Sequence, residues 1–223
     1  MPGWRARWRE LFQSFVSRAK VRTMNKENKN KIQPHTGDVL LIVDVQNDFL
    51  PGGSLAVPRG DEVVLVINRY LQIFAAYRLP VYATRDWHPE RHCSFLAQGG
   101  PWPPHCIADT RGAQFAASLQ LPSSAVIISK ATTVEQDAYS GFQGTNLDQL
   151  LRTANIRRLF IGGLATDYCV LNTVRDALQL GYEVLLLVDA IRAVDVQPGD
   201  GQRAEEEMTK LGAQRITVEE VAG

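Results

Sequence analysis

The chain has 223 residues, 45% of them hydrophobic, and equal numbers of basic and acidic residues leave it with no formal net charge. This length and composition predict one α/β domain with a single sizeable core. The longest apolar runs have the length of a strand and fall well short of the ~18 residues that a membrane span needs. Three cysteines exclude a disulfide framework, which predicts a cytoplasmic protein with reduced thiols.

The even charge balance hides two unlike parts. Residues 1–31 hold nine Lys/Arg and two Glu, a net charge of +7, and the remainder carries −7. The acidic remainder argues against nucleic-acid binding. We expect residues 1–36 to form a basic extension, partly an amphipathic helix and partly a polar linker, ahead of a globular domain at 37–223. A membrane-surface or transit helix is one interpretation of that extension. The slightly favoured alternative is an upstream extension of the reading frame, because Met24 offers a second start.

From residue 38 onward, apolar runs of strand length alternate with segments of helical period. Strands are expected at 38–45, 80–86, 124–130, 157–163, 183–190 and 214–220. Helices are expected at 60–78, 146–155, 168–181 and 198–212, with a short one near 112–119 in a long loop, and Asn146 as a cap. The alternation predicts an α/β fold: a three-layer α/β/α sandwich around a six-stranded, mostly parallel sheet.

Reactive side chains follow the predicted strands. Asp44 follows the first strand, Asp86 and His88 the second, Lys130 the third and Cys169 the fourth. In open parallel sheets, ligands bind beyond the carboxyl ends of the strands. The sequence therefore predicts that these side chains gather at one edge of the sheet.

Cys169 stands where an apolar run ending in two glycines passes into a helical pattern. If the strand ends near Gly163 and Thr166 caps the helix, Cys169 lies in its first turn. Free amides and the helix dipole there favour a thiolate and can hold an oxyanion. Asp44 can then accept the thiol proton, and Lys130 can stabilise the charges. A buried structural cysteine is the alternative for Cys169 alone.

The stretch from Asp86 to His105 has the composition of a metal site. Asp86 and His88 are two residues apart, so an extended chain points both to one side, and His105 returns after a loop. One carboxylate and two imidazoles suit Zn²⁺, Fe²⁺ or Mn²⁺. His92 is a fourth ligand or a group that supports the ligands. A hydrogen-bonded surface loop without an ion is the alternative.

Five stretches resemble the nicotinamidase/pyrazinamidase branch of the isochorismatase-like cysteine hydrolases. They are "LLIVDVQNDFLPGGSLAV", "ATRDWHPERHCSF", "GGPWPPHC", "KATTVEQDAYSGFQGTNL" and "IGGLATDYCVLNTVRDALQLGYEVLLLVDA". They run in unbroken order from about residue 38, whereas residues 1–36 have no counterpart. Small departures are Tyr168 before the cysteine, Gln143, and Cys93 beside His92.

The resemblance implies a set of site residues. The catalytic triad would be Asp44, Lys130 and Cys169, and the oxyanion hole would be the amides of Ala165 and Cys169, with a cis peptide before Ala165. The metal ligands would be Asp86, His88 and His105, with His92 as a variable fourth. The aromatic residues that line the ring pocket would be Phe49, Trp102 and Tyr139. The expected cofactor is one divalent ion, in the first place zinc, with iron or manganese as alternatives.

The resemblance also implies an activity. The expected enzyme is an amide hydrolase that converts nicotinamide to nicotinate and ammonia through a cysteine thioester, serves NAD salvage and also cleaves pyrazinamide. The small-molecule substrate is the only expected partner, and homo-oligomer formation stays open. A cysteine amidohydrolase for N-carbamoyl or ureido compounds is the nearest alternative. A non-catalytic metal-binding or membrane-tethered interaction protein is the alternative from another class.

Overall fold

The computed structural model describes residues 31–223. The chain divides into two units, of which the larger comprises residues 34–218 and Gly223. In the smaller unit, Ile32 pairs in parallel with Val221, and the amide of Ala222 donates to the carbonyl of Ile32 at 2.9 Å. The amphipathic helix predicted in the N-terminal extension lies outside the described residues. Among the described residues, no helix is long and apolar enough to cross a membrane.

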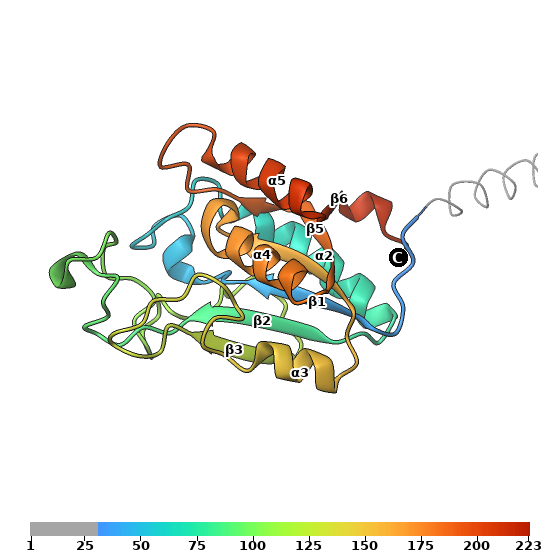
Figure 1. The fold of residues 1–223 in the computed structure, drawn as a ribbon, viewed down its shortest axis with the longest axis horizontal. Helices are drawn as coiled ribbons and strands as arrows, with labels where there is room; N and C mark the ends of the chain where they lie inside the picture. The colour runs from blue at the N-terminus through green and yellow to red at the C-terminus, as the bar shows by residue number, and fades with distance from the viewer. Residues whose placement is uncertain (1–30) are drawn as a thin grey trace, which may run out of the picture. The chain divides into compact units, whose positions relative to one another are not determined.

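The larger unit is built on one six-stranded sheet with the strand order β3-β2-β1-β4-β5-β6 (Figure 1). Every neighbouring pair is parallel, so the expected sheet is confirmed and is fully rather than mostly parallel. The strands are β1 (Asp38–Val43), β2 (Val81–Asp86), β3 (Val126–Lys130), β4 (Arg158–Leu164), β5 (Glu183–Arg192) and β6 (Gln214–Ile216).

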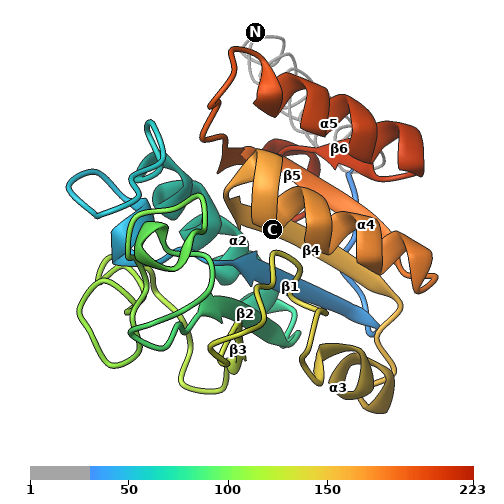
Figure 2. The same ribbon diagram turned by 60° about the vertical axis from the view of Figure 1, so that its left-hand side comes forward.

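Helices cover both faces of the sheet, which confirms the three layers. They are α2 (Glu62–Ala76), α3 (Leu147–Thr153), α4 (Leu171–Gln179) and α5 (Asp200–Leu211). Figure 2 shows α2 on one face and α3, α4 and α5 on the other. Short helical turns are η2 (Asn47–Phe49), η3 (Leu96–Gln98), η4 (Thr166–Val170, a π-helical turn) and η5 (Val218–Glu220).

Alternating side chains of the central strands enter the two halves of the core. Val39 and Leu41 of β1 pack in one cluster with Val174 of α4. On the face of α2, Phe74 meets Phe160 of β4 edge-on, with 5.1 Å between ring centroids. All six residues of β1 are buried, as expected of a central parallel strand covered on both sides.

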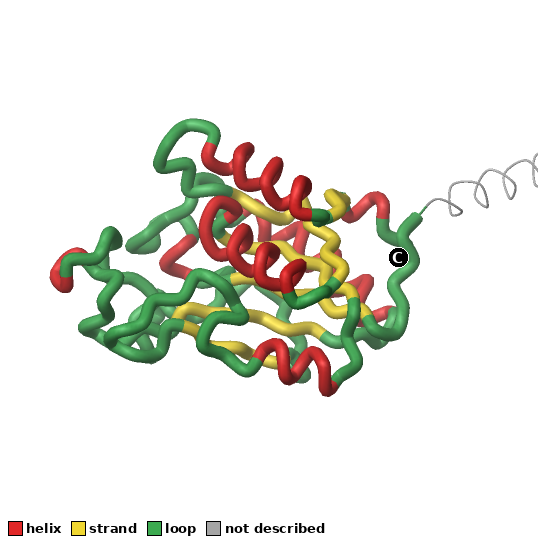
Figure 3. Tube along the Cα trace, in the orientation of Figure 1, coloured by secondary structure: helices red, strands yellow, loops and turns green. Residues whose placement is uncertain are grey.

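One local prediction is wrong, and another is confirmed in position only. The segment 112–119 forms turns instead of a helix, because its backbone bonds to the chain after β1: Ala116 N donates to Val45 O at 3.0 Å, and Asn47 N donates to Gln114 O at 2.9 Å. Asn146 takes the cap position before α3 as expected, but its side chain makes no capping hydrogen bond. The longest loops gather beyond the carboxyl ends of the strands, where Figure 3 shows them in green.

Candidate active site

Asp44, Lys130 and Cys169 meet at the carboxyl edge of the sheet. Asp44 follows β1, Lys130 ends β3, and Cys169 lies in η4 directly after β4. The ammonium Nζ of Lys130 lies 3.0 Å from Asp44 Oδ2 and 3.5 Å from Cys169 Sγ. All three side chains are buried. The residues that the sequence placed on separate strand ends thus form one cluster.

Lys130 is the central charge of this cluster. Its ammonium also contacts the Asp86 carboxylate and donates to the carbonyl of Ala138 at 2.9 Å. Burial acts to lower the pKa of Lys130, but the carboxylates of Asp44 and Asp86 outweigh it and hold the pKa well above 10.5. The side chain therefore stays a cation and balances part of the negative charge around the thiol.

Burial of the Cys169 thiol opposes the helix effect that favours a thiolate. Burial raises its pKa well above 9.0, and the attraction of Lys130 only partly offsets this. Burial also raises the pKa of Asp44 above 3.8, against the lowering effect of Lys130. A carboxyl group of raised pKa beside a protonated thiol is the arrangement of a base and its nucleophile.

Asp86, His88 and His105 bring one ligand atom each to within 4.8 Å of one another. The Nδ1 of His105 lies 2.8 Å from Pro103 O, and the Nδ1 of His88 lies 3.3 Å from Ala131 O. Such contacts turn each Nε2 toward the cluster, and the buried Nε2 of His88 has no hydrogen-bond partner among the described residues.

The protonation of His88 also suits metal binding. Burial and the neighbouring rings of His105 and His92 lower the pKa of His88 to about 3, so its imidazole is neutral. A neutral imidazole is the form that binds a metal. One carboxylate and two such imidazoles fit a divalent ion of the zinc or iron type.

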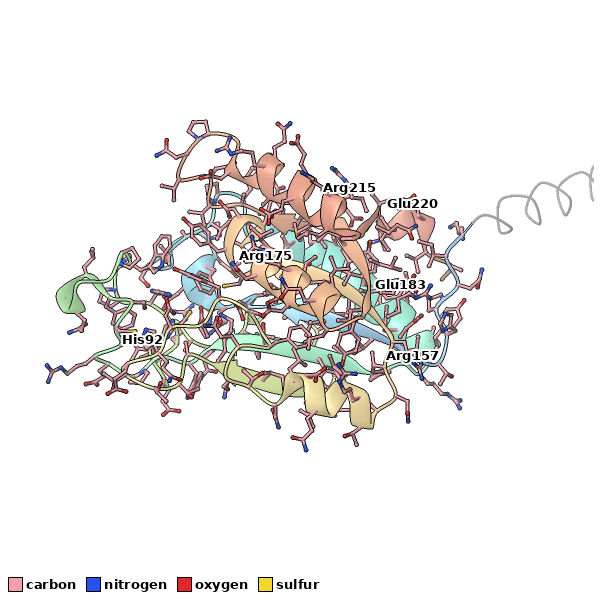
Figure 4. The ribbon with its side chains drawn as sticks, viewed as in Figure 1. His92, Arg157, Arg175, Glu183, Arg215 and Glu220 are labelled. Atoms are coloured by element: carbon pink, nitrogen blue, oxygen red, sulfur yellow. The ribbon has the colours of Figure 1, made fainter. Side chains whose placement is uncertain are left out.

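His92 lies beside this set, in the loop region where Figure 4 labels it. Its ring stacks on His88 with 4.2 Å between centroids. Its Nδ1 lies 2.7 Å from Ser94 Oγ and its Nε2 lies 3.0 Å from Gln136 O. Because both nitrogens already have partners, the geometry favours the alternative in which His92 supports a ligand.

A cavity opens beside both clusters. Its lining includes Cys169, His88 and His105 as well as all three aromatic residues expected in the pocket, namely Phe49, Trp102 and Tyr139. Trp102 Nε1 donates to the Tyr139 hydroxyl at 2.9 Å, which fixes two of these rings against each other. Flat apolar walls with a few polar groups suit an aromatic ligand.

The isochorismatase domain model matches residues 38–220. The chain belongs to the isochorismatase family. A nicotinamidase of Escherichia coli is 42% identical over 200 residues, which cover 80% of this chain and 94% of that protein. These matches confirm the resemblance to the nicotinamidase/pyrazinamidase branch. At the level of the family, they also confirm the expectation of an amide-hydrolysing enzyme.

Two solved structures share the fold at substantial identity. A pyrazinamidase of Pyrococcus horikoshii in complex with zinc is 48% identical, with a TM-score of 0.78 over 81% of this chain and 99% of that one. An L. infantum protein in complex with nicotinate is 37% identical, with a TM-score of 0.80 over 86% of this chain and 98% of that one. Both are of the length of the domain described above.

In this family member, the turn that carries Cys169 differs in detail from the expectation. The strand β4 runs on to Leu164, Ala165 takes the cap position, and Thr166 is the first residue of the π-helical turn, so Thr166 is not the cap. The peptide before Ala165 is cis, as expected. Gly163 adopts a φ of +129°, and a Cβ there would lie 2.0 Å from the Val43 carbonyl, so glycine permits this approach to β1.

Several residues of the site were not predicted. The side chain of Gln46 accepts from Asp86 N and donates to Asp86 O, both at 2.8 Å, and so fixes the backbone of a metal ligand. Leu55 and Val194 line the cavity from separate loops, and Tyr168 lines it from η4. A glutamine directly after an apolar run of strand length is a usable signal in the sequence. The two aliphatic residues carry no such signal.

Proposed function

We propose that the protein is a nicotinamidase that hydrolyses nicotinamide to nicotinate and ammonia through a cysteine thioester. The observation that carries the proposal is the shared cavity: Cys169, from the buried Asp44–Lys130–Cys169 cluster, and the Asp86–His88–His105 set line the same aromatic-walled space. The nicotinamidase of 42% identity and the related structure with nicotinate support the choice of substrate.

The first half-reaction forms the thioester. Asp44 takes the thiol proton of Cys169, and the sulfur lone pair forms a bond to the carboxamide carbon while the carbonyl π electrons move to oxygen. The amides of Ala165 and Cys169 are proposed to hold this oxyanion. When the carbonyl re-forms, the carbon–nitrogen bond breaks, Asp44 returns its proton to nitrogen, and ammonia leaves.

The second half-reaction releases the acid. Asp44 takes a proton from water, and the hydroxide oxygen attacks the thioester carbon. The carbon–sulfur bond breaks, sulfur leaves with the bonding electrons, and the proton on Asp44 returns to it. Lys130 stays charged throughout and stabilises the carboxylate and the sulfur anion in turn. The product leaves as the carboxylic acid, which loses its proton to water and becomes nicotinate.

The ring is proposed to lie between Phe49, Trp102 and Tyr139, with its carboxamide toward Cys169. Asp86, His88 and His105 would hold the divalent ion, which supplies a Lewis-acidic position for the ring nitrogen and so helps orient the substrate. Zinc is the first choice, because the related pyrazinamidase was solved with zinc.

Three finer points belong to the same proposal. Pyrazinamide has the same carboxamide on a similar ring, so we expect it to be cleaved as well. Nicotinate production would serve NAD salvage. The cytoplasm is proposed as the compartment because Cys93, Cys106 and Cys169 are all free thiols.

The test is ammonia release from nicotinamide by the purified protein. We expect release by the wild type, by Cys93→Ala as the matched cysteine control, and none by Cys169→Ala. Ammonia release that survives in Cys169→Ala would contradict the thioester mechanism. Release from an N-carbamoyl or ureido compound, with none from nicotinamide, would assign the alternative substrate class.

A further inference from the structure

Asp48 lies in η2, next to the pocket residue Phe49, but its side chain belongs to neither cluster described above. Its Oδ2 accepts a hydrogen bond from the backbone amide of Cys106 at 2.7 Å. Its Oδ1 accepts from the amide of Ser54 at 3.3 Å. A half-buried carboxylate that bonds an amide far along the chain fixes one loop to another.

The amide that Asp48 holds is the one that follows His105. Cys106 adopts a φ of +46°, a backbone conformation that residues other than glycine rarely take. Its carbonyl accepts from His88 N at 3.0 Å, and the carbonyl of His88 accepts from Ala108 N at 2.8 Å. The backbone at Cys106 thus connects the two histidines of the metal set, and Asp48 bonds it from the other side.

The same loop closes tightly on the Asp48 carboxylate. A Cβ added at Gly112 would lie 2.0 Å from Asp48 Oδ2, so a larger residue there would displace the carboxylate. The backbone amide of Asp48 also donates to Gly112 O at 3.0 Å. Asp48 and the 105–112 loop are therefore joined by a backbone bond, by a side-chain bond and by direct packing.

We propose that Asp48 is a positioning residue for the metal ligand His105. By holding the Cys106 amide, it keeps the left-handed turn that aims His105 at Asp86 and His88, and its loss weakens binding of a divalent ion. This inference rests on the metal set of the proposed function but needs no particular substrate. Groups that orient ligands contribute about 10- to 100-fold in metal affinity.

Titration of the metal-free protein with Zn²⁺ alone, in competition with a chromophoric chelator, tests the proposal. We expect Asp48→Ala to raise the zinc dissociation constant by about 10- to 100-fold. Asp48→Asn keeps an acceptor oxygen for the Cys106 amide, so its affinity should recover most of that loss. The matched control is Asp109→Asn, which removes the same charge from an exposed position in the same loop.

The results distinguish an effect of the hydrogen bond to the Cys106 amide from an effect of the negative charge of Asp48. Equal losses in Asp48→Asn and Asp48→Ala would show that the charge matters rather than the bond, and would overturn the proposal. Zinc affinity in Asp48→Ala within about twofold of the wild type would also overturn it. Loss of affinity in Asp109→Asn as large as in Asp48→Ala would do the same.

A second variant guards against a failure to fold. Gly112→Ala keeps the carboxylate but drives it away from the Cys106 amide, so it should also raise the zinc dissociation constant, and unchanged affinity there would overturn the proposal. The assay contains no substrate. A protein that shows this pattern without releasing ammonia from nicotinamide would refute the proposed function and leave the role of Asp48 standing.

Discussion

Two buried aspartates stand at the ends of strand β1, one as its first residue and one directly after its last, and their carboxylates have different surroundings. At its amino end, Asp38 is fully buried and receives both Nε and Nη2 of Arg158, at 2.8 and 2.7 Å. The amide of His35 donates to the same carboxylate at 2.8 Å. Both carboxylate oxygens of Asp38 therefore accept hydrogen bonds from groups that are held in place, and the side chain joins β1 to β4.

At the carboxyl end, Asp44 is as deeply buried but less completely bonded. Thr84 donates to its Oδ1 at 2.6 Å. Its Oδ2 lies 3.0 Å from Lys130 Nζ, but the contact lacks hydrogen-bond geometry, and this oxygen has no hydrogen-bond partner among the described residues. A buried carboxylate with one oxygen free of hydrogen bonds can accept a proton, as a catalytic base must. A carboxylate whose two oxygens are both bonded to fixed donors serves as a structural ion pair.

Asp44→Asn should have the largest effect of these variants: a strong loss of turnover without a loss of stability. Removal of the base is expected to lower turnover by about 10²- to 10⁴-fold. The free energy of unfolding should not fall at neutral pH, because burial disfavours the ionised carboxylate in the folded protein. Steady-state ammonia release and urea unfolding measure the two quantities. Near-normal turnover would assign the base to another residue.

Asp38→Ala should show the reverse pattern. It leaves Arg158, whose side chain is only 14% exposed, without its bidentate partner, and should lower the free energy of unfolding by about 3 kcal/mol. Turnover per folded molecule should stay at the wild-type value. Glu183→Ala is the matched control, because that exposed carboxylate lies 3.9 Å from the same arginine. Its effect should stay below about 1 kcal/mol. Equal effects of the two variants would contradict the contrast.

The sequence predicts this contrast only in part. The six strands were predictable because β1 and its neighbours are buried on both faces, which leaves continuous apolar runs. Asp44 and Lys130 were predictable as site residues because parallel strands present their carboxyl ends at one edge. The position of Cys169 after the fourth strand was predicted too, but the burial that raises the pKa of its thiol was not, because burial depends on packing that no local pattern encodes.

The loops were the least predictable part of the molecule. The segment 112–119 has a helix-like pattern, yet its amide and carbonyl groups bond to the backbone after β1. Leu55 and Val194 reach the cavity only through loop conformations that depend on distant partners. From the sequence, Asp48 is only a polar residue in a turn. The structure shows that the amide of Cys106, fifty-eight positions away, donates to its carboxylate. Such long-range hydrogen bonds fix the loop conformations that build the site, and they leave no periodic pattern in the sequence.

The smallest expected effect concerns pH. Because the folded pKa of Asp44 is raised above 3.8, the folded state binds its proton more tightly, and wild-type stability is lost as pH rises from 3.8 through the folded pKa. The non-titrating Asp44→Asn variant lacks this loss. Its stability advantage should therefore grow with pH and then become constant, while Lys130 stays charged throughout.

Urea unfolding of both proteins from about pH 4 to about pH 8 measures that difference directly. Titrations shared by the two proteins cancel, which leaves the contribution of Asp44. The acid limb of kcat/KM for the wild type should fall in the same window, above 3.8, because the same carboxylate must be ionised to accept the thiol proton. A stability difference that shrinks as pH rises would mean that Lys130 outweighs burial. Asp44 would then resemble Asp38, the partner in a complete ion pair, and the base would have to be another residue near Cys169.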